Sequence, residues 1–494
     1  MIRFLHQQQE VALENVGADT SVLDYLREHR GLTGTKEGCA SGDCGACTVV
    51  VAKAAESGLE YTPVNACIAP LGSLHGTELI SVEDLKDGDK WHPVQKAMIE
   101  CHASQCGFCT PGFVMSLFAL YHSTADVEAA VDREKILEAL GGNLCRCTGY
   151  RPIIDAAEQA LAESGKDQFS RRAQATLDQL RALQDTESET AALETEHGHY
   201  YRPRDAAHVA SLLAEHPDAR LIAGGTDLFL ESTQALTPLP VLIDLAAVPG
   251  LHAVKVGKDE LGFGAAVTHR AAQDAVFNDY PELHELIQRF GSLQIRSQGT
   301  IAGNIANASP IGDWPPVFLA LGGSIELQSK SGIREVSVDD FFLDYRKTLQ
   351  EPGEFISTAK LPRRQAHTFL RAYKISKRFE DDISSVCAVF ALEMDNDRIV
   401  SAKAAFGGMA AIPKRGKAVE SALTGLNLRT DSVEAAIAAV PTDFQPITDA
   451  RASADYRLIV AQRLLERLQQ EYRGDTPTRV HDESGFKARV SSHA

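Results

Sequence analysis

The sequence lacks several features that mark whole classes of proteins. It has 49 Lys and Arg against 67 Asp and Glu, a formal net charge of −18, and no basic stripe. Because phosphate binding needs clustered Lys and Arg, nucleic acid is excluded as the main partner. No segment approaches about 18 consecutive apolar residues, and the start, MIRFLHQQQEVALENV, lacks the charged and apolar regions of a signal peptide. We therefore expect a cytoplasmic protein that does not bind membranes.

The composition is that of an ordinary globular protein, with 44% hydrophobic and 23% charged residues. A length of 494 residues is too great for one hydrophobic core and suggests roughly three domains. All but one of the ten cysteines lie in the first 147 residues. In a reducing cytosol such cysteines are metal ligands far more often than they are disulfides.

Patterns along the chain predict a multidomain α+β protein. Strands around one helix come first and four short helical segments follow; after an acidic stretch, DTESETAALETE, apolar runs alternate with helices. The acidic stretch offers little that could form a core, so it predicts a linker. The expected boundaries are 1–88 for a small α+β domain, 89–164 for a helical bundle, 165–197 for the linker, 198–380 for a mixed α/β domain, 381–475 for an α+β lobe and 476–494 for a polar tail.

The first cysteine group has the spacing of plant-type 2Fe-2S ferredoxins. GTKEGCASGDCGACTVV holds Cys39, Cys44 and Cys47, and Cys67 follows after nineteen intervening residues. Such a loop must wrap around a cluster, and glycines allow its turns without a Cβ clash. A four-cysteine zinc site is the alternative, but zinc sites favour two compact pairs. The glycines concerned are Gly38, Gly42 and Gly45.

The second group, CHASQCGFCTPG with GGNLCRCTGYRP, has five cysteines where a cluster uses four. Cys101 falls on the apolar stripe of a helix near its C-terminus, where the helix dipole disfavours a thiolate, so we expect it in the core. The other two pairs run into helix starts, where backbone N–H groups stabilise thiolates. The predicted ligands are therefore Cys106, Cys109, Cys145 and Cys147. Considered alone, a C-x-x-C pair together with a C-x-C pair would also suit zinc.

These motifs resemble the two iron-sulfur modules of the molybdenum hydroxylases, the family of xanthine dehydrogenase and aldehyde oxidase. In that family the same four cysteines of the second group are ligands. The resemblance implies a β-grasp ferredoxin-like domain, a four-helix 2Fe-2S domain and an α/β FAD-binding domain of the molybdenum hydroxylase flavoprotein type. The family usually has Gly-Glu after the first cysteine, where this chain has Ala40 and Ser41.

The flavin region is expected in LIAGGTDL and QGTIAGNIANASPIGDWPP, whose small residues let a pyrophosphate approach the backbone. A glycine-rich surface loop would have the same composition, and the resemblance decides for FAD. By position, it places these residues around FAD: Leu221, Ile222, Ala223, Gly224, Gly225, Thr226, Asp227, Leu228, Phe290, Thr300, Ile301, Ala302, Gly303, Asn304, Asp313, Ile356 and Lys374. Asp313 would accept from a cofactor hydroxyl, and Lys374 would place a positive charge near the flavin. Tyr345 and Asp381 match positions at the flavin face and the nicotinamide access.

The resemblance also implies a function. Electrons would pass from a molybdopterin cofactor in a separate large subunit through two 2Fe-2S clusters to FAD, which would reduce NAD+ during the oxidation of hypoxanthine or xanthine to urate. The chain would then hold no catalytic residue for the hydroxylation and would assemble as a dimer of heterodimers. Two alternatives stay open: a subunit of another molybdenum hydroxylase acting on an aldehyde or N-heterocycle, and a zinc-stapled interaction protein without a redox role.

Overall fold

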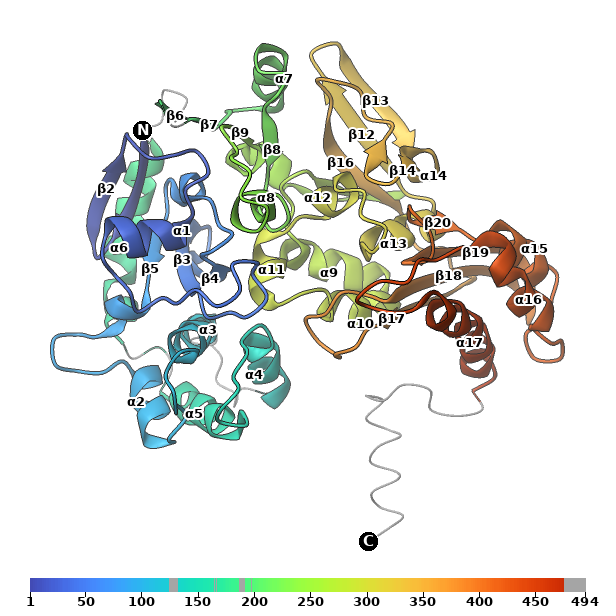
Figure 1. The fold of residues 1–494 in the computed structure, drawn as a ribbon, viewed down its shortest axis with the longest axis horizontal. Coiled ribbons are helices and arrows are strands. Elements are labelled where there is room, and N and C mark those ends of the chain that lie inside the picture. Colours follow the sequence, from blue (N-terminus) through green and yellow to red (C-terminus); the bar gives the residue numbers. More distant parts are fainter. Residues whose placement is uncertain (124–131, 164, 166, 186–191, 197, 475–494) are drawn as a thin grey trace, which may run out of the picture.

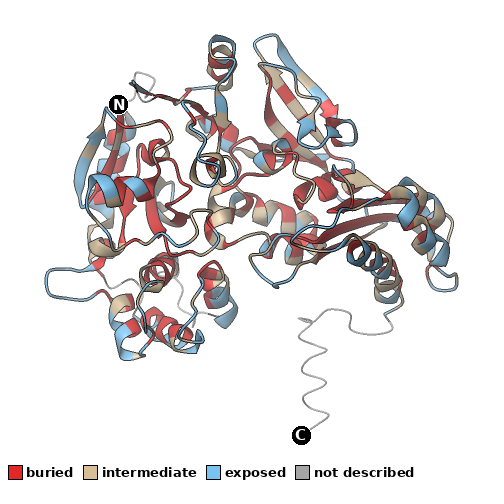
Figure 2. Cartoon of the chain, viewed as in Figure 1, coloured by how far each residue is buried: buried red, intermediate tan, exposed pale blue. Residues whose placement is uncertain are grey.

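The computed structural model describes residues 1–123, 132–163, 165, 167–185, 192–196 and 198–474. In Figure 1 the two N-terminal domains lie at one side, the middle third of the chain occupies the centre, and the C-terminal lobe lies at the other side. Figure 2 shows that each part has its own buried interior. The predicted polar tail 476–494 lies outside the described residues. No helix of the described chain is long and apolar enough to cross a membrane.

The first domain is a five-stranded sheet in the order β2-β1-β5-β3-β4. β1 pairs in parallel with β5, which completes the predicted ferredoxin-like β-grasp. The helix that packs on the sheet begins after Ser21, whose side chain accepts from the amide of Asp24 in a reciprocal capping box. The elements are β1 (Ile2–His6), β2 (Gln9–Leu13), α1 (Val22–Asp24) continued by η1 (Tyr25–His29), β3 (Thr48–Ala55), β4 (Gly58–Asn65), η2 (Leu71–Leu74), β5 (Glu78–Ile80) and η3 (Val82–Leu85).

The second domain contains the four predicted helices. Its core is aromatic and aliphatic, and Phe113, Phe118 and Tyr121 are fully buried within it. These three residues lie on one long helix that is buried almost all around, as expected of the central helix of a small bundle. The helices are α2 (Pro93–Glu100), α3 (Thr110–Ser123), α4 (Arg133–Leu140) and α5 (Arg151–Leu161).

The predicted linker 165–197 is wrong over most of its described length. Residues Gln168–Asp185 form a helix, α6, that packs on β1, β3 and β4 of the first domain. Leu177, Leu180 and Leu183 are buried there, and they recur every three residues along one face. The acidic stretch that suggested a linker follows this helix, and its residues 186–191 lie outside the described chain.

The flavin region is built on two sheets. The first has the order β6-β7-β9-β8 and already begins inside the predicted linker, and the second has the order β10-β11-β16-β12-β13. The strands of the first are β6 (Ala192–Thr195), β7 (Gly198–Tyr201), β8 (Arg220–Ile222) and β9 (Val241–Asp244); those of the second are β10 (Val254–Val256), β11 (Glu260–Gly264), β12 (Ser324–Ser329), β13 (Gly332–Ser337) and β16 (Phe355–Pro362). The helices are α7 (Ala206–Glu215), α8 (Phe229–Thr233), η4 (Leu245–Ala247), η5 (Pro249–His252), α9 (His269–Asp279), η6 (Pro281–Leu283), α10 (His284–Gln288), α11 (Leu293–Gln298), α12 (Ile301–Ala306), α13 (Trp314–Leu321) and α14 (Val338–Phe341), and β14 (Phe342–Asp344) pairs with β15 (Lys347–Thr348).

The C-terminal lobe is an antiparallel sheet in the order β17-β18-β19-β20, with a helical layer that includes the long α17. Its first strand begins at Thr368, before the predicted boundary at 381, because β17 pairs along its whole length with β18. The elements are β17 (Thr368–Ile375), β18 (Val386–Asp395), β19 (Arg398–Gly407), β20 (Lys414–Arg415), α15 (Lys417–Leu423), α16 (Glu434–Asp443) and α17 (Ala454–Arg473).

Candidate redox centre

The four cysteines of the first group converge in the loop between η1 and β3 and at the end of β4. The Sγ atoms of Cys47 and Cys67 lie 3.3 Å apart, and the amide of Cys44 donates to Cys39 Sγ at 3.4 Å. A hydrogen bond between the thiols of Cys39 and Cys44 lowers the pKa of Cys39 to about 4. Converging thiols with N–H groups aimed at sulfur suit an iron-sulfur cluster.

The residue after the first cysteine has a backbone conformation that favours Gly. Ala40 has φ 51°, in the left-handed region that Gly occupies without strain. Gly42 and Gly45 have φ of 79° and 66°, as their predicted turning role requires. Gly38 is needed for another reason, because a Cβ there would lie 2.8 Å from the Sγ of Cys44.

The second group forms two sulfur pairs that join distant segments. The thiols of Cys109 and Cys145 contact each other, and so do those of Cys106 and Cys147. Cys106 and Cys109 precede α3, and Cys145 and Cys147 precede α5. The amide of Thr148 donates to Cys145 Sγ at 3.5 Å. Burial raises the pKa of Cys109 to about 12, and its cysteine neighbours add to the effect.

Cys101 lies apart from these pairs. It caps the C-terminal end of α2, and its Sγ donates to Gln159 Oε1 at 3.2 Å. The side chain is half-buried against the bundle core, so the expectation of a core residue describes only part of its surroundings. Cys387, predicted to be a core residue of its strand, is fully buried in β18.

The two cysteine loops touch each other directly. The amide of Leu144, next to Cys145, donates to the carbonyl of Cys44 at 3.0 Å. The Asn143 side chain donates to the carbonyl of Gly45 at 3.0 Å. The two groups that the sequence separates by almost one hundred residues are therefore joined by hydrogen bonds one or two residues from their thiols.

The two predicted pyrophosphate segments also meet. β8 ends at Ile222, and the turn after it packs so closely that a Cβ on Gly224 would lie 1.9 Å from the carbonyl oxygen of Gln298. Thr300 then begins α12, and its hydroxyl accepts from the amide of Gly303 at 3.0 Å. The turn after β8 and the start of α12 together form a surface of small residues with helix-start backbone amides, which we call the small-residue shelf. Such a surface suits a pyrophosphate.

Asp313 and Lys374 form a buried ion pair. Lys374 Nζ lies 2.6 Å from Asp313 Oδ2, and Ser384 Oγ donates to Asp313 Oδ1 at 2.6 Å. Both carboxylate oxygens are thus engaged within the protein. In the structure the two residues form one unit, because the carboxylate neutralises the ammonium.

The remaining predicted residues are spread over a wider area. Phe290 packs against His269 with ring centroids 4.2 Å apart and the rings tilted by 53°. Ile356 is buried in β16, Tyr345 is 57% exposed just after β14, and Asp381 is partly buried beside the C-terminal lobe. Burial, together with the charge of Asp43 in the first cysteine loop, raises the pKa of Asp381 to about 7.

Sequence reasoning missed the residues that connect these parts. His269 accepts from Trp314 Nε1 at 2.9 Å, and the amide of Trp314 donates to Asn304 at 3.3 Å, so Phe290 and the small-residue shelf share one network. Asn143 and Gln294 are buried between domains. No pattern in one sequence identifies such partners, although Asn143 stands inside the GGNLCRC motif.

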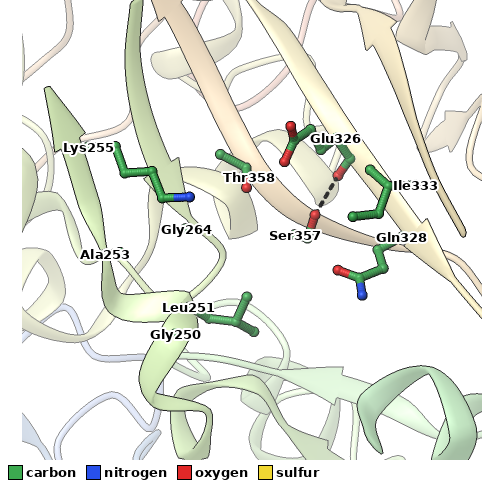
Figure 3. Close-up of a pocket in the computed structure, with 10 residues that line it drawn as sticks. All are labelled: Gly250, Leu251, Ala253, Lys255, Gly264, Glu326, Gln328, Ile333, Ser357 and Thr358. Atoms are coloured by element: carbon green, nitrogen blue, oxygen red, sulfur yellow. Dashed lines mark hydrogen bonds between the residues drawn. The ribbon is translucent and has the colours of Figure 1, made fainter. Parts of the chain in front are cut away.

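The pocket drawn in Figure 3 lies elsewhere. It is a groove on the face of the second flavin-region sheet away from the core, with polar side chains of β10, β12 and β16 around it. None of the predicted FAD residues lines it.

Four consecutive parts of the chain match known domain families. Residues 4–72 match a 2Fe-2S iron-sulfur cluster binding domain, and 81–158 match a 2Fe-2S binding domain. Residues 193–364 match the FAD binding domain in molybdopterin dehydrogenase, and 371–472 match the CO dehydrogenase flavoprotein C-terminal domain. The fold and these domains define an iron-sulfur flavoprotein with two cluster domains.

Curated relatives narrow the class. Xanthine dehydrogenase/oxidase of Rattus norvegicus is 33% identical over 430 residues, which are 78% of this chain and 32% of the relative. Xanthine dehydrogenase of Emericella nidulans is 32% identical over 502 residues, 90% of this chain and 36% of the relative. The chain spans about a third of the length of these relatives. The chain belongs to the molybdenum hydroxylase family and corresponds to its iron-sulfur and FAD part.

Solved structures agree with this assignment. Reconstituted CO dehydrogenase from Oligotropha carboxidovorans is 28% identical with a TM-score of 0.52, covering 54% of this chain and 94% of that one. Quinoline 2-oxidoreductase from Pseudomonas putida 86 is 26% identical with a TM-score of 0.50, covering 55% and 96%.

Proposed function

We propose that the chain is the small, iron-sulfur and FAD subunit of a xanthine dehydrogenase. FAD would deliver electrons to NAD+ while hypoxanthine or xanthine is oxidised to urate at a molybdopterin cofactor in a separate large subunit. The xanthine dehydrogenases at about 33% identity support this substrate. When bound, a 2Fe-2S cluster carries one electron and FAD exchanges one or two, so the set converts single electrons into a two-electron reduction.

The observation that carries the proposal is the convergence of the cysteines in two groups of four beside the flavin segments. We assign one cluster to Cys39, Cys44, Cys47 and Cys67 and the other to Cys106, Cys109, Cys145 and Cys147. The sulfur contacts within each group support this division. Since Cys101 bonds to Gln159, it is left out.

The contacts favour an order of transfer. The first cysteine loop touches the flavin region: Gln234 donates to the carbonyls of Cys39 and Ala40 at 3.0 Å, and a Cβ on Gly225 would lie 3.0 Å from the carbonyl of Ile68. The ferredoxin-like domain therefore lies against the flavin region, where FAD would bind. The helical domain would receive electrons first and pass them on through the contact between Leu144 and Cys44.

The solvent-exposed side of the second cysteine group is suited to contact with a partner protein. Cys106 and Cys147 are exposed, and Phe108, Leu144 and Tyr150 beside them are 48%, 41% and 37% exposed. Exposed apolar groups around a redox site indicate a protein interface more than a free surface. The large subunit would cover this face and bring its molybdenum close to the second cluster, within the dimer of heterodimers that we propose.

The FAD residues would act as follows. The segments Leu221–Leu228 and Thr300–Asn304 would hold the pyrophosphate with backbone amides. The Asp313–Lys374 pair would orient one face of the cofactor, with Phe290 and Ile356 contributing apolar contact. Tyr345 and Asp381 would border the approach of NAD.

The proposal is tested by purifying the chain with its bound partner and assaying it with xanthine and NAD+. Formation of urate and NADH that requires a molybdenum-containing partner would support the proposal. A complex that contains iron, flavin and molybdenum but does not turn over xanthine would contradict xanthine as the substrate. The CO dehydrogenase and quinoline 2-oxidoreductase similarities favour one alternative, a molybdenum hydroxylase of another substrate. Turnover of an aldehyde or an N-heterocycle in the same assay would decide for it.

A further inference from the structure

Four buried polar side chains meet where the three redox domains join. Gln294 of the flavin region directs its amide nitrogen to Thr48 Oγ1 at 3.2 Å, to Ser116 Oγ at 3.1 Å and to Asn143 Oδ1 at 3.3 Å. Thr48 belongs to the ferredoxin-like domain, and Ser116 and Asn143 belong to the helical domain. Each is at most 2% exposed. We call Thr48, Ser116, Asn143 and Gln294 the junction cluster.

Asn143 connects this cluster to both cysteine loops. Its amide nitrogen donates to the carbonyl of Gly45, between Cys44 and Cys47, and its own position is two residues before Cys145. Ser116 holds Asn143 in place by donating to its Oδ1 at 2.7 Å. A single fixed side chain therefore sets where one cysteine loop lies relative to the other.

Gln294 connects the cluster to the flavin segment. It lies on α11, whose last residue, Gln298, accepts from the amide of Asn65 in the ferredoxin-like domain at 3.1 Å. Arg296 on the same helix bonds to Glu138 of the helical domain at 2.6 Å. The chain then continues into Thr300 and the small-residue shelf. The short helix α11 thus binds both iron-sulfur domains and leads directly into the predicted pyrophosphate segment.

We propose that Asn143 and Gln294 are positioning residues for electron transfer, which fix the separation of the two cluster sites and hold the flavin segment against them. An apolar contact would also seal this junction, but it would let the domains slide, whereas buried hydrogen bonds define one register. Transfer between redox centres slows steeply with distance, so a small displacement here changes the rate. The inference rests on the electron-transfer chain proposed above.

The test uses Gln294→Met, which keeps the length of the side chain and removes the amide. It also uses Ser116→Ala, a mild change within α3 that removes the hydroxyl bonded to Asn143. Gln470→Met on the exposed face of α17 is the matched control. Iron, acid-labile sulfide and FAD content are measured first in the parent protein, since their absence there would count against the proposed chain of cofactors, and then in each variant. Electron paramagnetic resonance of the fully reduced protein then reports the magnetic coupling between the two reduced clusters.

With cofactor content unchanged, we expect Gln294→Met and Ser116→Ala to alter the coupling between the clusters and to slow flavin reduction after rapid one-electron reduction. A severalfold slowing is expected if the displacement approaches one ångström. The double variant Gln294→Met with Asn143→Leu should change the coupling and the rate by less than the two single effects added together. The reason is that both substitutions disrupt the same hydrogen-bond network. Unchanged coupling and unchanged rates in both single variants, equal to those of Gln470→Met, would overturn the proposal.

Discussion

Gly112→Ala tests the contact between the two cysteine loops. Gly112 lies in the first turn of α3, and a Cβ there would lie 2.1 Å from the carbonyl oxygen of Gly45. Since real Cβ contacts stay above 3.0 Å, the carbonyl must withdraw by at least 3.0 − 2.1 = 0.9 Å. That oxygen accepts from the Thr48 amide at 3.1 Å, from Thr48 Oγ1 at 2.7 Å and from Asn143 at 3.0 Å, so the shift strains three hydrogen bonds.

The two effects of this substitution oppose each other. Helix propensity alone would make Ala more stable than Gly by about 1 kcal/mol. Overpacking costs about 1–3 kcal/mol, and each weakened hydrogen bond adds about 1 kcal/mol. We expect a net loss of about 3–5 kcal/mol in the free energy of urea unfolding, with altered coupling between the clusters. Gly250→Ala, where a Cβ meets nothing within 4 Å, is the control. A Gly112→Ala protein that is more stable than the parent would refute the reasoning.

Three further predictions address single residues. Cys101→Ala should keep both iron-sulfur signals in electron paramagnetic resonance, whereas Cys106→Ala should lose one; the reverse would falsify the helix-end argument. Burial, aided by a nearby Arg, lowers the pKa of His269 from 6.5 to about 3, so the stability due to the neutral ring is complete above 6.5 and is lost as pH falls toward 3. His269→Gln keeps an acceptor for Trp314 and should therefore flatten the fall in urea midpoint below pH 6.5; an unchanged slope would contradict this. Lys374→Met should lower the free energy of unfolding by about 3–5 kcal/mol, because a buried carboxylate loses its cation, and should reduce FAD content; a fully stable flavoprotein would disprove that pairing.

The sequence predicts the domain order well because the informative patterns are local. The cysteine spacings and the helix starts after Cys109 and Cys147 each depend on a few neighbouring residues. The helix α6 was missed because acidic residues following it outweighed its apolar stripe of Leu177, Leu180 and Leu183. The spacing of these three leucines by itself predicts a helix, independently of how acidic the segment is.

The contacts between domains could not be predicted from one sequence. Asp313 and Lys374 lie 61 positions apart and Asn143 and Gln294 lie 151 apart, and neither pair has a local signature. Their meeting depends on how the sheets and helices pack, which periodicity does not specify. Lys374 accordingly looked like an isolated charge, although its carboxylate partner was itself among the predicted residues.

The central claim is that the chain holds two 2Fe-2S clusters and FAD. Its most direct test is the content of iron, acid-labile sulfide, zinc and flavin in the purified protein. We predict about four iron and four sulfide ions per chain with one FAD and no stoichiometric zinc. A colourless protein that contains zinc, without iron or flavin, would contradict the account.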